Sequence, residues 1–118
     1  MKTSLLSMLK TGIIISVLIF SELAYGQSVH DYLLQAKAFI SSGRPEQSVT
    51  ILTEALARNQ DSRLFLVRAE AFILTGDYSG AIADFNSAND LSDQSGEFGL
   101  ARVYALKGDA ATSLYHLE

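Results

Sequence analysis

The sequence predicts an all-α protein built from about three similar helical hairpins. Three glycines, Gly43, Gly76 and Gly108, lie 33 and 32 residues apart, and similar residues recur at fixed distances from each of them. A fixed period of this length is the sequence pattern of repeat architectures. The chain also holds a single proline and no tryptophan, whereas an all-β protein would need more chain breakers at its many turns.

The recurring residues alternate between small and large. Seven residues before each glycine stands an alanine, and four before each stands an aromatic residue. This alternation lets two helices approach at the small position while the ring fills the gap beside it. The matching positions are Ala36, Ala69 and Ala101; Phe39, Phe72 and Tyr104; and, after the glycines, Ser48-Val49, Ala81-Ile82 and Ser113-Leu114, then Leu52, Phe85 and Leu117.

Each glycine is expected to end a helix in the left-handed conformation, with a residue that can begin a helix close behind it. Pro45 lies where the first helical residue is expected, and Asp77 and Asp109 are suited to be N-caps.

The connections between units also contain start signals. Asp61 or Ser62 can begin the third helix, and Ser92 or Asp93 the fifth. The sequence therefore predicts helices over 29–42, 45–58, 62–75, 78–91, 95–107 and 110–118.

The first 26 residues have a different character from the rest. Lys2 and Lys10 precede an apolar run over 13–20, and small residues at Ala24 and Gly26 follow. This order is typical of a secretory signal peptide cleaved after Gly26. An uncleaved membrane anchor is the alternative, although the run is shorter than the ~20 residues of a spanning helix. We therefore expect a leader over 1–26 and a repeat domain over 27–118, with units at 29–61, 62–93 and 94–118, the last incomplete.

The middle unit resembles a tetratricopeptide repeat (TPR), and the resemblance extends over nearly all of 29–118. It implies a right-handed superhelical stack of about three helix-turn-helix repeats that binds protein rather than catalyses a reaction. Gln35 and Arg68 stand where the family has leucine, and Glu97 occupies an aromatic position, so the third unit is expected to pack loosely at its start. The matching residues are Phe65-x2-Arg68-Ala69-x2-Phe72, Gly76-Asp77-Tyr78, Ala81-Ile82, Phe85 and Ala88.

The resemblance also implies where a partner would bind, because first helices of such repeats line a concave groove. Lys37, Glu70 and Arg102 hold equivalent positions with alternating charge. They form either ion pairs between helices or, through Lys37 and Arg102, a receiver for an acidic or C-terminal group. An apolar peptide, extended or helical, suits the groove best. The predicted partner-binding residues are Leu33, Lys37, Leu66, Val67, Glu70, Phe98 and Arg102.

Little in the sequence indicates chemistry. The chain has no cysteine, and its two histidines, His30 and His116, lack acidic neighbours at the spacing of a metal site. Asp84 and Asp90 are expected on a solvated outer face. Without the first 26 residues the formal charge is −5, which argues against binding to nucleic acid. No catalytic, cofactor-binding or metal-binding residue is predicted.

The sequence therefore predicts an interaction scaffold in the cell envelope or outside the cell, binding a peptide or partner protein. Two alternatives remain: an N-terminal fragment of a longer exported repeat protein, used in assembly or uptake, and an accessory subunit of an envelope enzyme. Because the sequence given stops inside its last predicted helix, we expect four residues to be partly uncovered: Val103, Tyr104, Leu114 and Leu117. That end is a candidate for docking to a second copy or to another protein.

Overall fold

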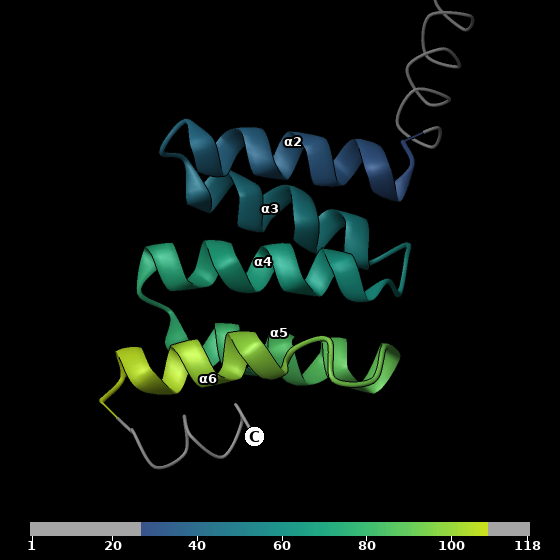
Figure 1. Cartoon of the computed structure of the whole chain (residues 1–118). Helices are drawn as coiled ribbons and strands as arrows, with labels where there is room; N and C mark the ends of the chain where they lie inside the picture. The colour runs from purple at the N-terminus through teal and green to yellow at the C-terminus, as the bar shows by residue number, and fades with distance from the viewer. Residues whose placement is uncertain (1–26, 109–118) are drawn as a thin grey trace, which may run out of the picture.

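The computed structural model describes residues 27–108, which form five α-helices and no strand (Figure 1). The predicted leader, the helix predicted over 110–118 and His116 lie outside these residues. The helices are α2 (Val29–Ser41), α3 (Pro45–Leu56), α4 (Ser62–Thr75), α5 (Tyr78–Leu91) and α6 (Glu97–Leu106).

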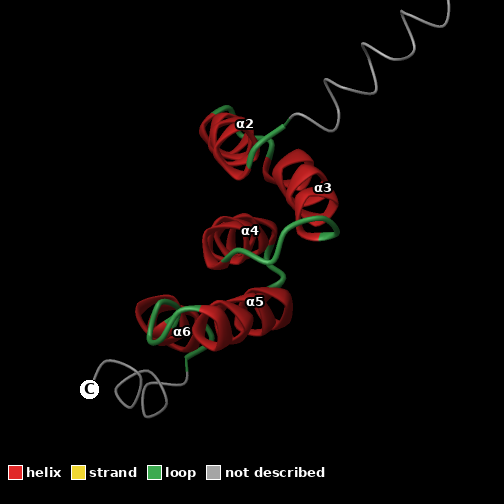
Figure 2. Cartoon of the chain, turned by 90° about the vertical axis from the view of Figure 1, so that its right-hand side faces the viewer, coloured by secondary structure: helices red, strands yellow, loops and turns green. Residues whose placement is uncertain are grey.

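The helices lie in two rows. Figure 2 shows α2, α4 and α6 on one side of the stack and α3 and α5 on the other. Each hairpin contributes one helix to each row, and α2, α4 and α6 run in the same direction (Figure 1). This is the all-helical stack of hairpins that the glycine spacing predicts, with α2–α3 and α4–α5 as its two described hairpins.

The turns after α2 and α4 have the same geometry. Gly43 and Gly76 adopt φ angles of 77° and 83°, in the left-handed region. The amide of Asp77 donates to the carbonyl of Phe72 at 2.8 Å, and Gly76 donates to Ile73 at 3.1 Å. The turn at Gly43 has the same two bonds. This pattern pairs the last free carbonyls of a helix, so the predicted role of both glycines is confirmed.

Side chains cap three helix starts. Ser28 and Asp31 form a reciprocal capping box at α2, in which the backbone amide of Ser28 donates to the Asp31 carboxylate at 3.0 Å. That bond is the main cause of the lowered pKa of Asp31. Asp61 caps α4, and hydrogen bonding from the Arg63 side chain lowers its pKa. Asp77 caps α5, as predicted, by accepting from the amide of Gly80 at 2.9 Å.

Three predicted helix ends lie slightly too far along the chain, since α2 ends at Ser41, α3 at Leu56 and α6 at Leu106. After α3, the side-chain amides of Asn59 and Gln60 donate to the carbonyls of Ala55 and Leu56 at 3.2 Å. The carbonyl of Ala55 still accepts from the backbone amide of Asn59 at 2.9 Å, whereas that of Leu56 accepts from the Gln60 side chain in place of the next helical hydrogen bond.

The predicted start of the fifth helix was wrong. α6 begins at Glu97, with Gly96 as its N-cap, rather than after Ser92 or Asp93. Gln94 adopts a φ of 61°, and the side-chain oxygen of Asn89 on α5 accepts from the amide of Gly96 at 2.6 Å. The chain therefore turns once more before the helix can begin.

The expected loose packing at the start of the third unit is wrong for a related reason. The amide nitrogen of Asn89 donates to the carboxylate of Glu97 at 2.6 Å. The hydroxyl of Ser95 donates to the carbonyl of Ala88 at 2.9 Å. Glu97 thus replaces the family's ring with a polar connection to the preceding helix.

The core consists of two clusters that meet along α4. The first joins α2 and α3 to the start of α4, surrounds Leu52 and Leu64, and includes Tyr32 and Leu33. The second joins α4, α5 and α6, with Val103 fully buried within it. The expectation that Val103 is partly uncovered was therefore wrong, whereas Tyr104 is half-buried. Leu114 and Leu117 lie outside the described residues.

A close contact brings α6 against α5. A methyl group on Gly99 would lie 2.2 Å from the Cε1 atom of the Phe85 ring, closer than such atoms approach. Phe85 is itself buried. The absence of a side chain at Gly99 therefore lets the ring of Phe85 contact the α6 backbone.

The prediction that Asp84 lies on a solvated face was also wrong. Asp84 is 3% exposed, and its two carboxylate oxygens accept from Nε and Nη2 of Arg68, both at 2.7 Å. Nη1 of Arg68 donates to the hydroxyl of Thr53 at 3.0 Å. Arg68 thereby connects α4 to both α3 and α5. Asp90, by contrast, is exposed as expected.

The flat face of the Arg68 guanidinium is also occupied. Its carbon lies 5.8 Å and 5.5 Å from the ring centres of Phe65 and Phe72. Stacking of this kind favours arginine over other cations. The position at which TPR sequences have leucine thus carries a partly buried arginine with partners for its edge and its faces.

Candidate interaction surface

The outward sides of α4 and α6 form one surface, which we call the α4–α6 face. Residues four apart on a helix lie on the same side, and each of these helices repeats an apolar, charged, apolar order at that spacing. The surface is defined by Leu66, Glu70 and Leu74 on α4 and by Phe98, Arg102 and Leu106 on α6.

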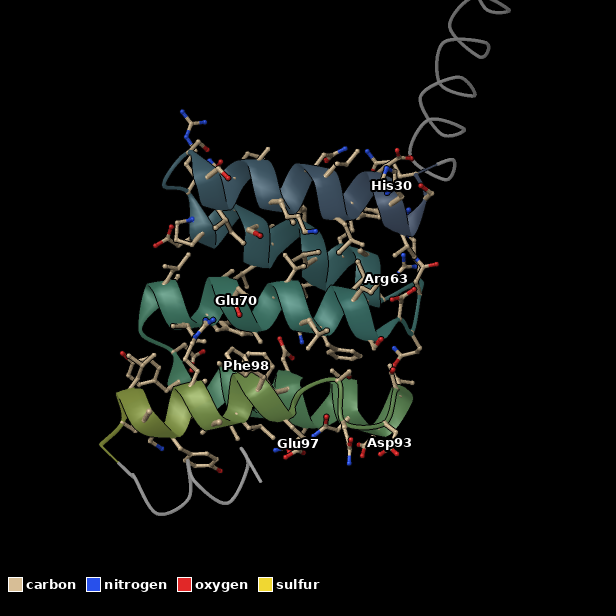
Figure 3. The ribbon with its side chains drawn as sticks, in the orientation of Figure 1. His30, Arg63, Glu70, Asp93, Glu97 and Phe98 are labelled. Carbon is tan, nitrogen blue, oxygen red and sulfur yellow. The ribbon has the colours of Figure 1, made fainter. Side chains whose placement is uncertain are left out.

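Phe98 is the most exposed large apolar residue of the described chain, with 72% of its surface accessible. Its neighbours Gly99 and Leu100 are buried, so the backbone of α6 is fixed against α5 while the ring of Phe98 faces outward. Figure 3 shows Phe98 and Glu70 on the same side of the stack. A phenylalanine this exposed contributes little to the core, whereas its full burial on a partner would contribute up to about 1.5–3 kcal/mol.

Glu70 and Arg102 form an ion pair across the face, 32 residues apart in the chain. Both side chains remain about two-fifths exposed, and such pairs contribute about 0–1 kcal/mol. The pair confirms the ion-pair interpretation for these two residues. It also places Glu70 of α4 and Arg102 of α6 at the same level along the two helix axes.

Lys37 does not join this pair. It is exposed on α2, and within residues 27–108 no ion pair to it is formed. Of the predicted receivers for an acidic group, Lys37 therefore remains available, whereas Arg102 already binds Glu70.

Three predicted apolar residues differ in their accessibility. Leu33 is only 7% exposed and belongs to the first core cluster, so it cannot form the floor of a binding surface as predicted. Leu34, one position later, is exposed instead. Leu66 and Val67 are half-buried and pack against the second and first clusters, respectively.

Sequence reasoning missed two residues of this surface. Leu74 and Leu106 are 58% and 51% exposed. Both lie two residues before a repeat glycine, and each lies four residues after a member of the ion pair. The spacing that placed Glu70 and Arg102 on the surface could therefore have placed these leucines there as well.

The described residues offer little for chemistry. Between residues 27 and 108, no group of three or more histidine and acidic side chains could hold a metal ion. His30 is exposed in the first turn of α2. None of the five helices is long and apolar enough to cross a membrane.

Comparison with known proteins supports the fold. No protein-family model and no curated protein matches the sequence. Among solved structures, the chain is similar to the crystal structure of MamA, a TPR-like helical protein, with a TM-score of 0.69 and 16% identity. The match covers 81% of this chain and 58% of that one. The protein thus has a TPR-like helical repeat fold and spans a little more than half the length of that neighbour.

Proposed function

We propose that this protein is a non-enzymatic interaction scaffold that binds a peptide or partner protein on its α4–α6 face. TPR-like folds typically act as such scaffolds. The observation that carries the proposal is the exposure of Phe98 on a helix whose backbone is fixed by the buried Leu100 and Val103. Exposed apolar clusters with charges between them are typical of protein-binding sites.

The face determines which chemistry a partner must have. Phe98, Leu74 and Leu106 require apolar side chains, and Glu70 and Arg102 require polar groups between them. Lys37 lies on the neighbouring first helix and would favour an acidic group at one end of a bound segment. Segments with apolar residues at regular spacing and few charges fit this arrangement.

We further propose that the protein acts in the cell envelope or outside the cell. The basic start, the apolar run over 13–20 and the small residues before Gln27 support this proposal. The intact mass of the purified protein tests it, because cleavage after Gly26 leaves a chain that begins at Gln27. An uncleaved chain recovered from membranes would instead support the anchor.

Site-specific photo-crosslinking tests the binding surface. A photoreactive phenylalanine analogue replaces Phe98 in the full chain in living cells, and the same analogue at Leu91 is the control. Leu91 is also exposed but lies on α5, in the other row. We expect covalent products with a protein chain from position 98 and few or none from Leu91. Equal labelling from both positions, or none from either, would rule out the α4–α6 face.

A further inference from the structure

We propose that the partner of the α4–α6 face is a second copy of the same chain, bound in a two-fold symmetric dimer. This inference rests on the proposed function, because it names the occupant of the same surface. It follows from the order of charges and apolar residues on the two helices.

The two helices carry matching residues at three levels. The ion pair shows that Glu70 and Arg102 lie side by side, and α4 and α6 run in the same direction (Figure 1). Residues four positions before and after the pair therefore lie at matching levels as well. Leu66 lies level with Phe98, and Leu74 with Leu106.

A two-fold axis parallel to the helices and midway between them makes this face self-complementary. It sets α4 of one copy opposite α6 of the other without changing the level of any residue. Glu70 then faces Arg102 of the second copy, and Leu74 faces Leu106. Each charge meets its opposite across the interface, and each apolar residue meets another, as symmetric dimer interfaces require.

The alternative face-to-face arrangement is unfavourable. A two-fold axis perpendicular to the helices places α4 opposite α4, so that Glu70 faces Glu70 and Arg102 faces Arg102. Like charges in contact oppose association. The alternating signs on α4 and α6 therefore select one orientation of the dimer.

Complementary charge variants test this arrangement. The variant Glu70→Arg carries two positive charges on the face, and Arg102→Glu carries two negative charges. Each variant alone should be monomeric, because its two copies repel each other. An equimolar mixture should form a heterodimer, because opposite charges then meet across the interface.

Analytical ultracentrifugation measures the molar mass over a wide range of protein concentration. The full chain is expressed, and the protein is used in the form that the host produces, with or without the predicted leader. We expect the natural chain to dimerise and Phe98→Glu to raise the dimer Kd by about 30-fold or more, as for a central interface residue. Leu91→Glu is the control, because Leu91 is exposed on α5 in the other row. It should leave the dimer Kd within about twofold. Circular dichroism confirms that each variant is folded.

Two results would overturn the dimer. One is a natural chain that stays monomeric at every concentration. The other is a mixture of the two charge variants that stays monomeric while both are folded. The crosslinking experiment separates this failure from failure of the proposed function. Products of twice the chain mass from position 98 support the dimer. Products with a different protein would support the scaffold function and contradict self-association.

Discussion

The hairpins α2–α3 and α4–α5 follow the same pattern of small and large residues, but their buried polar groups differ in whether they have hydrogen-bond partners. In α2–α3 the hydroxyls of Tyr32 and Ser48 are buried with no hydrogen-bond partner among the described residues. In α4–α5 the position equivalent to Ser48 is Ala81, and the buried carboxylate of Asp84 has two bonds from Arg68.

The shared fold therefore goes with the residue sizes and glycine turns that the two hairpins have in common, and not with their buried polar groups. Both hairpins close with the same glycine turn and nest small residues against rings. Their buried polar groups are paired in α4–α5 and unpaired in α2–α3. Burial of an unpaired hydroxyl costs about 1–3 kcal/mol, whereas removing one member of a buried ion pair costs more because it leaves an unpaired buried charge.

The largest expected effect is the loss of the buried carboxylate. Asp84→Ala leaves the Arg68 guanidinium without its main partner, and we expect the free energy of unfolding to fall by about 3–5 kcal/mol. Chemical denaturation measures this change. Ile51 holds the position equivalent to Asp84 in the first hairpin. The double variant Arg68→Leu/Asp84→Ile therefore introduces this isoleucine and replaces both members of the ion pair by apolar residues.

The double variant should recover most of the lost stability, because replacing both members of a buried ion pair by apolar residues is often neutral. A double variant as unstable as Asp84→Ala would mean that the bonds of Arg68 to Thr53 and its two rings are equally important. The difference between the two hairpins would then depend on all the contacts of Arg68, and not on its ion pair with Asp84 alone.

The contact between α5 and α6 tests how tightly small and large side chains are packed between neighbouring helices. Between α5 and α6, Phe85 lies against Gly99. Between α3 and α4, the equivalent positions hold Leu52 and Val67. Gly99→Ala should therefore lower the free energy of unfolding by about 1–3 kcal/mol through overpacking. Adding Phe85→Leu should restore part of it. If Gly99→Ala alone leaves the melting temperature unchanged, the contact is not tight.

Substitutions in the two glycine turns should have the same effect on stability in both hairpins. Gly43 and Gly76 both adopt positive φ angles with open space around the missing side chain. Replacing either by alanine should cost about 1–2 kcal/mol from backbone strain alone. Thermal unfolding of the two single variants should give nearly equal losses. A much larger loss at one turn would show that its surroundings also matter.

Removing the unpaired hydroxyls should improve the first hairpin. Tyr32→Phe and Ser48→Ala should each raise the free energy of unfolding by about 1 kcal/mol, since no hydrogen bond among the described residues is lost. Ala81→Ser provides the matched control, because it adds an unpaired hydroxyl to the second hairpin and should destabilise it. Loss of stability in Tyr32→Phe would reveal a partner for the hydroxyl.

The smallest expected effect depends on pH. The pKa values of Asp31 and Asp61 are lowered in the folded chain, so the unfolded chain binds protons more readily. Their contribution is complete above the unfolded pKa of about 3.9 and disappears as the pH falls through the lower folded values. Asp61→Asn should therefore be less stable than the natural chain at neutral pH, with a smaller difference in melting temperature in acid. A difference that does not change with pH would exclude this linkage.

Much of the fold could be predicted from the sequence because glycine turns and small–large alternation are local signals. The bounds of α4 and α5 agree with the prediction. The start of α6 could not be predicted, because Asn89, whose side chain binds the amide of Gly96, belongs to the preceding helix. Asp84 was misplaced for the same reason. Its partner Arg68 was noted only as a departure from the family, although a charge at a leucine position calls for a buried opposite charge.

The candidate surface was predicted less well. Phe98, Glu70 and Arg102 lie on one face as expected, but Leu33 does not. Adjacent helical residues point about 100° apart, so a position carried over from a family can be wrong by one residue and change from surface to core. Periodicity within each helix was the stronger signal, and it leads to Leu74 and Leu106.

The contacts of Arg68 with both hairpins affect how the molecule unfolds. In a stack where repeats contact only their neighbours, an end unit can unfold while the rest stays intact. The guanidinium of Arg68 binds Thr53 in one hairpin and Asp84 in the other, so separation of the hairpins exposes a charge that both had covered. Fraying from the first hairpin is thereby penalised, and the amide protons of α3 and α4 should exchange with solvent in the same cooperative event.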